Sequence, residues 1–206
     1  MMKVKCLTVG AIASNCYLVW CEETKEAMVI DPGGEGQRIL SEIAKEGLQV
    51  RYIVNTHGHM DHIAANAVVK EGTGAQLAIH AEDVPLLSDT EMNLSAYMGK
   101  KYCAPETDLI LHEGEELTAG KVTLAVLHTP GHSRGSISLK GDGVIFSGDT
   151  LFADSVGRTD FPGGSYEELV DSIKNKILTC EDHFIVYPGH GPATTVGHER
   201  VHNPFF

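Results

Sequence analysis

The sequence has no hydrophobic run long enough to cross a membrane, since no apolar stretch approaches the roughly 20 residues that span a bilayer. Its first residues, Met1 to Val9, alternate between polar and apolar side chains like a first strand. They lack the apolar core and the cleavage site of a secretory signal peptide. We therefore expect a cytoplasmic protein with no membrane partner.

Cysteine is scarce and forms no recognisable pattern. The chain has five cysteines, none of them in a Cys-x-x-Cys pair, and their odd number argues against a complete disulfide framework. They are Cys6, Cys16, Cys21, Cys103 and Cys180. A reducing compartment fits this pattern best, which agrees with a cytoplasmic location.

Basic residues are also in short supply. The chain has 16 Lys and Arg against 28 Asp and Glu, so its formal net charge is −12. It therefore lacks the basic surface that neutralises a phosphate backbone, and nucleic acid is not an expected partner. A local basic pocket for a small substrate is still compatible with this charge, with Arg158 and Arg134 as the candidate substrate-binding residues.

The 206 residues suit a single domain over residues 1–206 with a substantial core. Periodicity predicts four strands in the first quarter of the chain, at 3–9, 15–21, 26–30 and 50–54. A helix is predicted from Gln37 to Glu46, and a second one over 62–69. The segment 81–104 is broken by proline and glycine and favours short helices, so we interpret it as an excursion over a cleft.

The second half of the chain returns to strands between Lys121 and Ser147, including a hairpin with a turn at 140–143. A helix follows, because Ser165 and Glu168 form a capping box ahead of an apolar face. A last strand is predicted over 184–187. Two rounds of strands with helices between them predict packed sheets with helices on their outer faces.

The most informative feature that is present is a cluster of metal-binding side chains. In an extended segment, residues two apart project to the same side, so His57 and His59 can converge on one ion. Asp61 and His62 follow after a turn. The cluster lies between a buried strand and a helix, in a loop where a rigid scaffold can present side chains to a cleft.

Three further candidate ligands, His132, Asp149 and His190, each follow an apolar strand-like run and stand beside glycine. Glycine and proline fix such turns and keep bulk away from a metal. Imidazole nitrogen and carboxylate oxygen are the ligands that borderline divalent metals prefer. Seven of them exceed the four of a closed structural site, so the sequence predicts two divalent metal ions, with zinc first and iron or manganese as alternatives.

These residues together resemble the metallo-β-lactamase superfamily: a His-x-His-x-Asp-His motif, then a Gly-His, an Asp after a strand, and a last Gly-His. The resemblance implies an α/β (α+β) protein with a four-layer αββα sandwich and the metals at the sheet edge. It implies one ion held by His57, His59 and His132, a second held by Asp61, His62 and His190, and a bridge at Asp149. Asp31 resembles the family carboxylate that supports the ligands from behind.

Within the superfamily, residues 157–164 and 199–205 are similar to the short glyoxalase II-like hydrolases. That resemblance implies hydrolysis of a hydroxyacylglutathione thioester such as S-lactoylglutathione. The chain departs from full-length glyoxalase II in two ways. No C-terminal helical domain that grips glutathione is expected, and Gly58 stands where those enzymes usually have His.

The expected chemistry is hydrolysis by a metal-bridged hydroxide. Two cations would lower the pKa of a shared water toward neutrality, and Asp61 would orient the attacking hydroxide as the catalytic residue. The expected partner is a small-molecule thioester or ester. The alternatives are a lactone or other small acyl-ester hydrolase, and a persulfide dioxygenase with a single iron. The sequence leaves the oligomeric state open.

Overall fold

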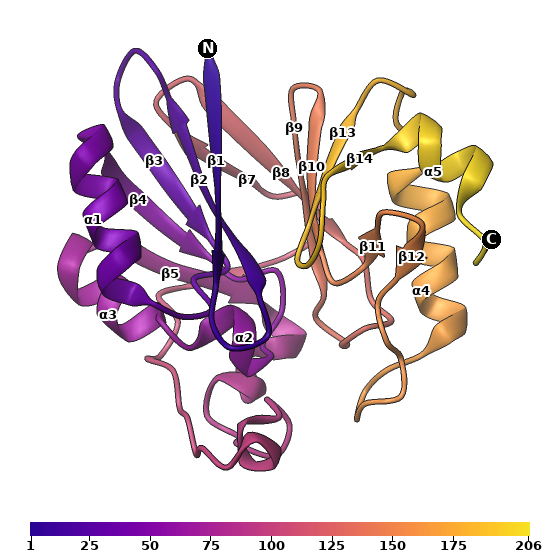
Figure 1. Cartoon of the computed structure of the whole chain (residues 1–206), viewed down its shortest axis with the longest axis horizontal. Coiled ribbons are helices and arrows are strands. Elements are labelled where there is room, and N and C mark those ends of the chain that lie inside the picture. The colour runs from indigo at the N-terminus through magenta and orange to yellow at the C-terminus, as the bar shows by residue number, and fades with distance from the viewer.

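Two six-stranded sheets lie face to face at the centre of the computed structural model, which describes all of residues 1–206 (Figure 1). The first sheet has the order β1 (Met2–Val9), β2 (Ser14–Cys21), β3 (Glu26–Ile30), β4 (Gln49–Val54), β5 (Gln76–His80) and β6 (Leu109–Leu111). The second has the order β14 (Thr194–Thr195), β13 (Ile185–Pro188), β10 (Val144–Gly148), β9 (Ile137–Gly141), β8 (Val122–His128) and β7 (Glu116–Ala119). A separate hairpin pairs β11 (Leu151–Phe152) with β12 (Ser155–Val156).

Helices cover the outer face of each sheet, as Figure 1 shows. The first sheet is covered by α1 (Gly36–Glu46) and α3 (Asn66–Thr73), and the second by α4 (Tyr166–Ser172) and α5 (Val196–His202). The four layers are therefore helix, sheet, sheet and helix, which confirms the predicted αββα sandwich. None of the helices is long and apolar enough to cross a membrane.

Strand β2 shows how the sequence builds these layers. All eight of its residues are buried. Tyr17 and Val19 point into the cluster between the two sheets, while Leu18 and Trp20 point to the cluster under α1 and α3. A strand buried on both faces reads as a continuous apolar run, and its two-residue period feeds alternate side chains to the two layers.

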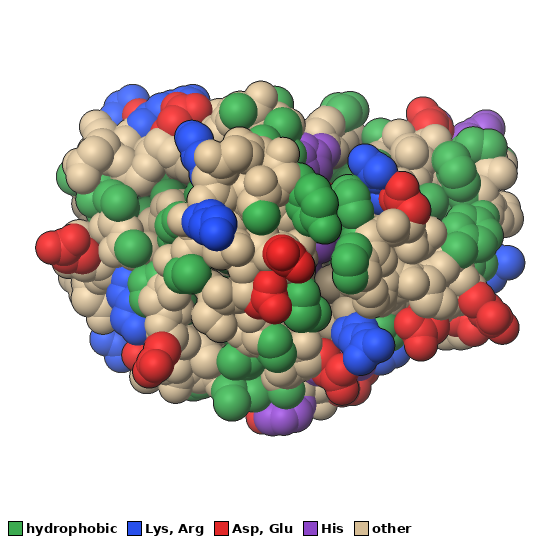
Figure 2. All heavy atoms as spheres, turned by 90° about the horizontal axis from the view of Figure 1, so that it is seen from below, with side chains coloured by type: hydrophobic (Ala, Val, Ile, Leu, Met, Phe, Trp, Pro, Cys, Tyr) green, Lys and Arg blue, Asp and Glu red, His purple; other side chains and the backbone are tan.

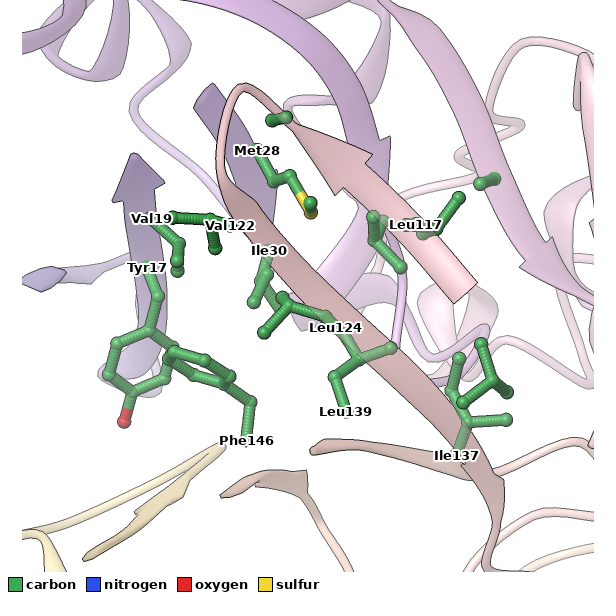
Figure 3. Packing of buried hydrophobic residues seen from close by; sticks show 14 of the residues in the cluster. Tyr17, Val19, Met28, Ile30, Leu117, Val122, Leu124, Ile137, Leu139 and Phe146 are labelled. Carbon is green, nitrogen blue, oxygen red and sulfur yellow. The ribbon is translucent and has the colours of Figure 1, made fainter. Parts of the chain in front are cut away.

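The cluster between the sheets contains 17 buried residues, among them Met28, Ile30, Leu124 and Phe146 (Figure 3). The Phe146 ring stacks on Tyr187 at a centroid distance of 5.3 Å and meets Tyr17 edge-on at 5.2 Å. Phe146 is the largest side chain that is fully buried. It joins the two sheets from β10, the strand that leads to the candidate ligand Asp149.

The helix predicted over 62–69 is two helices, α2 (Met60–Ile63) and α3. The break falls at Ala64 and Ala65, because the Ala65 N–H donates to the Pro32 carbonyl at 2.8 Å instead of continuing the helical ladder. The predicted last helix also changes character, since α4 runs into a π-helical turn, η3 (Ile173–Ile177). In that turn the Leu178 N–H donates to the Ile173 carbonyl, one residue further back than in an α-helix.

The segment 81–104 forms two short 3-10 helices, η1 (Ala81–Leu87) and η2 (Ser95–Met98), as the sequence predicts. It lies outside both sheets, below the first one in Figure 1. Strands β5, β6, β7, β11, β12 and β14 and helix α5 were not predicted.

We expect Phe146→Ala to lower the free energy of unfolding by about 3–5 kcal/mol, because it leaves a cavity between two sheets that cannot collapse onto each other. Urea denaturation followed by far-UV circular dichroism measures this loss. Ile110→Ala is the matched control, since Ile110 is 50% exposed on β6 and should change the stability by no more than about 0.5 kcal/mol. Equal losses in the two variants would contradict the assigned core.

Candidate metal centre

The candidate ligands come from the carboxyl ends of strands in both sheets. His57, His59, Asp61 and His62 follow β4, and His132, Asp149 and His190 follow β8, β10 and β13. Strands β3 and β4 run parallel, as do β10 and β13, so their carboxyl ends meet at the same edge of the sandwich. The structure thus brings all seven predicted ligands together.

The first group consists of His57, His59 and His132, all at least 97% buried. The Nδ1 atom of His59 lies 2.9 Å from the Nε2 atom of His132, with the two rings nearly perpendicular. The His57 ring lies 4.7 Å from each of the other two rings, measured between centroids. Three imidazoles therefore present ring nitrogens to one small volume.

Hydrogen bonds behind two of these rings fix which nitrogen carries the proton. Nδ1 of His132 lies 2.7 Å from the Arg158 carbonyl, which can only accept, so His132 donates from Nδ1 and keeps a lone pair on Nε2. The Thr56 hydroxyl donates to Asp31 at 2.6 Å and therefore accepts from Nδ1 of His57 at 3.2 Å. Nε2 of His57 is left with its lone pair toward the cluster. Such backing groups set the tautomer of metal-binding histidines.

The second group consists of Asp61, His62 and His190. One Asp61 oxygen, Oδ2, lies 3.2 Å from Nε2 of His62 and 3.0 Å from Nε2 of His190. Behind the ring, Nδ1 of His62 contacts Oδ2 of Asp31 at 3.0 Å. Asp31 is 1% exposed and supports ligands of both groups, which is the place that the family resemblance implies for it.

Asp149 lies between the two groups. Its Oδ1 atom is 3.4 Å from Nε2 of His62, and its Oδ2 atom is 3.6 Å from Nε2 of His132 and 3.7 Å from Nε2 of His190. The carboxylate can lie here only because residue 189 is glycine. A Cβ on Gly189 would stand 2.1 Å from Oδ1 of Asp149. Asp149 thus occupies the place of a bridging carboxylate.

The two groups differ in their protonation. Burial, reinforced by the neighbouring histidines, lowers the pKa of His57 well below its usual range and that of His59 to about 3. Burial also opposes the charging of His62 and His190, but the nearby carboxylates, chiefly Asp61, outweigh it and raise both pKa values. Burial opposes ionisation of Asp61 as well, yet its histidine neighbours hold its pKa below the usual range.

Three buried polar atoms have no hydrogen-bond partner: Nε2 of His57, Nε2 of His62 and Oδ1 of Asp149. A buried polar atom without a partner is costly, and all three belong to the candidate ligands. Borderline divalent cations bind imidazole nitrogen and carboxylate oxygen. The donor set therefore fits metal ions, and the lone pairs converge where ions would be held.

Asp83, on η1, is a residue that sequence reasoning missed. Its buried carboxylate accepts from the Gly58 N–H at 2.9 Å, the Ser133 hydroxyl at 2.7 Å and the Gly135 N–H at 2.7 Å. It therefore ties the loop of His57 and His59 to the loop of His132. Nothing in its local sequence distinguishes it from an ordinary surface aspartate.

Close packing against η1 also explains the departure at position 58. A Cβ on Gly58 would lie 2.4 Å from Cβ of Leu86 and 3.2 Å from the Asp83 carbonyl oxygen. No side chain fits there unless η1 moves. Glycine at this position is therefore required by the packing of η1 onto the ligand loop.

Ser133 stands in a Gly-His-Ser-Arg-Gly segment that matches the Gly-x-Ser-x-Gly pattern of serine hydrolases. Here the serine is 2% exposed, and its hydroxyl contacts Asp83 and Ser136, both at 2.7 Å. It is therefore a structural hydroxyl and not an accessible nucleophile.

A cavity of about 580 Å³ opens onto the candidate ligands. Arg158, a candidate substrate-binding residue, is one of its lining residues. Arg134 does not line it and instead borders a neighbouring polar pocket with Glu82 and His128. Asn93, Leu94, Tyr97 and Met98 form part of the wall, so the segment 81–104 does extend over the cleft.

The fold and the site define a class of protein, the metal-dependent hydrolases built on an αββα sandwich. Residues 9–199 match the family model described as the metallo-beta-lactamase superfamily. The chain therefore belongs to the metallo-β-lactamase superfamily, which confirms the family resemblance of its sequence.

Three known proteins are similar to this chain over nearly its whole length. The hydroxyacylglutathione hydrolase GloC of Haemophilus influenzae is 36% identical over 212 residues, covering 99% of this chain and 98% of that protein. The crystal structure of BLEG-1 B3 metallo-beta-lactamase is 39% identical with a TM-score of 0.94, covering 100% of this chain and 99% of that one. The crystal structure of TTHA1623 in a di-iron-bound form is 36% identical with a TM-score of 0.87, covering 98% and 100%.

We expect Asp83→Asn to weaken metal binding about 10- to 100-fold. The substitution replaces one acceptor oxygen with an NH₂ group, which cannot accept from the N–H and O–H groups that surround it. Metal content after dialysis against a chelator series measures the effect, and circular dichroism checks that the fold persists. Glu82→Gln, the neighbouring change on η1, should leave metal retention unchanged. Normal retention in Asp83→Asn would show that the two ligand loops hold their positions without this carboxylate.

We expect acidification to release metal from the second group first. The raised pKa values of His62 and His190 mean that protons compete with metal there at a higher pH than at His59, whose pKa is lowered to about 3. Stepwise lowering of the pH from 7.5 to 3, with the metal retained by the protein measured after each step, should show two separate losses. Loss of both ions in one step would contradict this difference.

Proposed function

We propose that this protein is a metal-dependent hydrolase that acts on a thioester of the hydroxyacylglutathione type. The observation that carries the proposal is a complete set of seven converging ligands at the end of a substrate-sized cavity. The similarity to GloC over nearly the full length of both chains supports the choice of thioester.

We infer that two divalent ions are held here, one by His57, His59 and His132 and the other by Asp61, His62 and His190, with Asp149 shared between them. When bound, such ions lower the pKa of a water toward neutrality and polarise the carbonyl that is attacked. Zinc is the first candidate, and the di-iron form of TTHA1623 supports iron as the alternative.

The residues of the chain supply orientation. Asp61 lines the cavity and stays ionised, so its carboxylate can accept a hydrogen bond from the attacking water and direct it. The contacts of Asp31 and the Arg158 carbonyl keep His62 and His132 in the orientation described above. The Phe161 ring packs edge-on against His59 and shields that side from bulk water.

The test is a substrate panel on metal-loaded protein. S-D-lactoylglutathione should be hydrolysed with a kcat/KM at least a hundredfold above that for a simple lactone, a β-lactam, a phosphodiester or a persulfide. A hundredfold is about 2.7 kcal/mol of transition-state stabilisation, enough to separate a substrate from generic reactivity. The β-lactam is included because of the similarity to BLEG-1.

Two outcomes would replace the proposal. A lactone or another small ester preferred by that margin would make the protein an acyl-ester hydrolase. One iron per chain by elemental analysis, with oxygen consumed on a persulfide, would make it a mononuclear-iron persulfide dioxygenase. About two metal equivalents together with thioester turnover would support the proposal.

A further inference from the structure

The cavity beside the candidate ligands is mostly apolar where it is not made of ligands. Its walls come from the β1–β2 turn, from the segment 81–104, from β11 and from the loop that follows β12. The apolar lining residues include Ile12, Leu94, Tyr97, Met98, Phe152 and Phe161. Figure 2 shows histidine side chains at the bottom of a cleft that is flanked by hydrophobic side chains.

Several of these apolar side chains are exposed to an unusual degree. Ile12 is 48% exposed, Met98 42% and Tyr97 75%. They come from two separate segments and meet at the mouth of one cavity. Grouped exposed apolar side chains at a cavity mark a surface that is covered when a ligand binds.

The lining offers no free positive charge. Apart from the candidate ligands, its only charged residues are Arg158 and Asp160. They form a two-point pair, with Nε donating to Oδ1 at 2.9 Å and Nη2 donating to Oδ2 at 2.7 Å. The guanidinium also lies 4.3 Å from the centre of the Phe161 ring. Arg158 is thus already paired and stacked.

The polar residue Asn93 is also fully engaged. Its side-chain amide donates to the carbonyls of Leu86 and Tyr102, and its oxygen accepts from the Ser95 N–H. Lys100 and Lys101, the nearest lysines in the sequence to this wall, are not among the lining residues. A carboxylate held against these walls, away from the metal centre, would lose water and gain no cation, which is unfavourable.

We propose that the cavity walls select an uncharged, apolar acyl group, and that the charged thiol portion of the thioester stays outside the cavity. This inference rests on the proposed thioesterase function and specifies which side of the scissile bond is recognised. Glutathione carries two carboxylates, whereas an acyl chain is what an apolar wall without a free cation can bind. The enzyme should therefore discriminate between acyl groups and tolerate exchange of the thiol.

The experiment uses metal-loaded protein and two series of thioesters. Acetyl, butyryl and hexanoyl groups are joined either to glutathione or to N-acetylcysteamine, an uncharged thiol. We expect kcat/KM to rise about three- to fourfold per added methylene until the cavity is filled, in line with the transfer free energy of a CH₂ group. Exchange of glutathione for N-acetylcysteamine should change kcat/KM less than threefold.

A drop of tenfold or more on removing glutathione, with no dependence on chain length, would overturn the inference and leave the thioesterase function standing. Binding is measured separately by titration calorimetry with S-hexyl-N-acetylcysteamine and S-hexylglutathione, which cannot be hydrolysed. Equal affinities within threefold support the inference. If no thioester is hydrolysed but both thioethers bind equally, the proposed function fails and the apolar selection stands.

Variants separate the wall from the metal centre. Met98→Ser should reduce the advantage of hexanoyl over acetyl at least threefold while metal content stays at the wild-type level. Val201→Ser is the matched control, since Val201 is 73% exposed on α5 and does not line the cavity. An unchanged hexanoyl-to-acetyl ratio in Met98→Ser would count against the apolar wall.

Asp160→Asn supplies the converse test. It removes the carboxylate that neutralises Arg158 and so leaves a cation at the cavity. We expect the ratio of kcat/KM for glutathione thioesters to kcat/KM for N-acetylcysteamine thioesters to rise several-fold in this variant. No increase would mean that the Arg158–Asp160 pair does not decide how charged thiols are treated.

Discussion

The whole edge of the sandwich depends on one physical constraint, the burial of several lone pairs in one small space. Imidazole nitrogens and carboxylate oxygens that face one another have lost water, and three of them have no partner in the protein. Such an arrangement persists only if the backbone behind it cannot relax. Strand ends from both sheets, the Asp31 and Asp83 carboxylates and tight packing at Gly58 and Gly189 supply that rigidity.

Much of this site could be predicted from the sequence because its strongest signal is local. Four candidate ligands lie within six residues, and the others each follow an apolar strand, so alternation and residue type were enough to find them. The layers could also be predicted, since apolar runs such as β2 show burial on both faces. The helix over 62–69 was wrong as one piece because its interruption depends on Pro32, some thirty residues earlier.

The features that were not predicted depend on contacts between segments that are distant in the sequence. Asp83 acts through partners at 58, 133 and 135, and no pattern around it reports them. Arg134 and Arg158 looked equivalent in the sequence, yet only Arg158 reaches the cavity. Short elements such as β6 and β14, of three and two residues, carry too little periodicity to be recognised before their pairing partners are known.

The segment 81–104 has two parts that differ in how they are attached to the metal centre. Its first turn, η1, is fastened to the ligand loops by Asp83 and Leu86, whereas η2 presents Tyr97 and Met98 to the cavity and supplies no candidate ligand. Substitutions in η1 and in η2 should therefore have different effects. Tyr97 and Met98, which are exposed and supply no candidate ligand, can vary with less effect on the metal centre than the residues of η1. A library randomised at these two positions would therefore sample new substrate ranges on the same metal site.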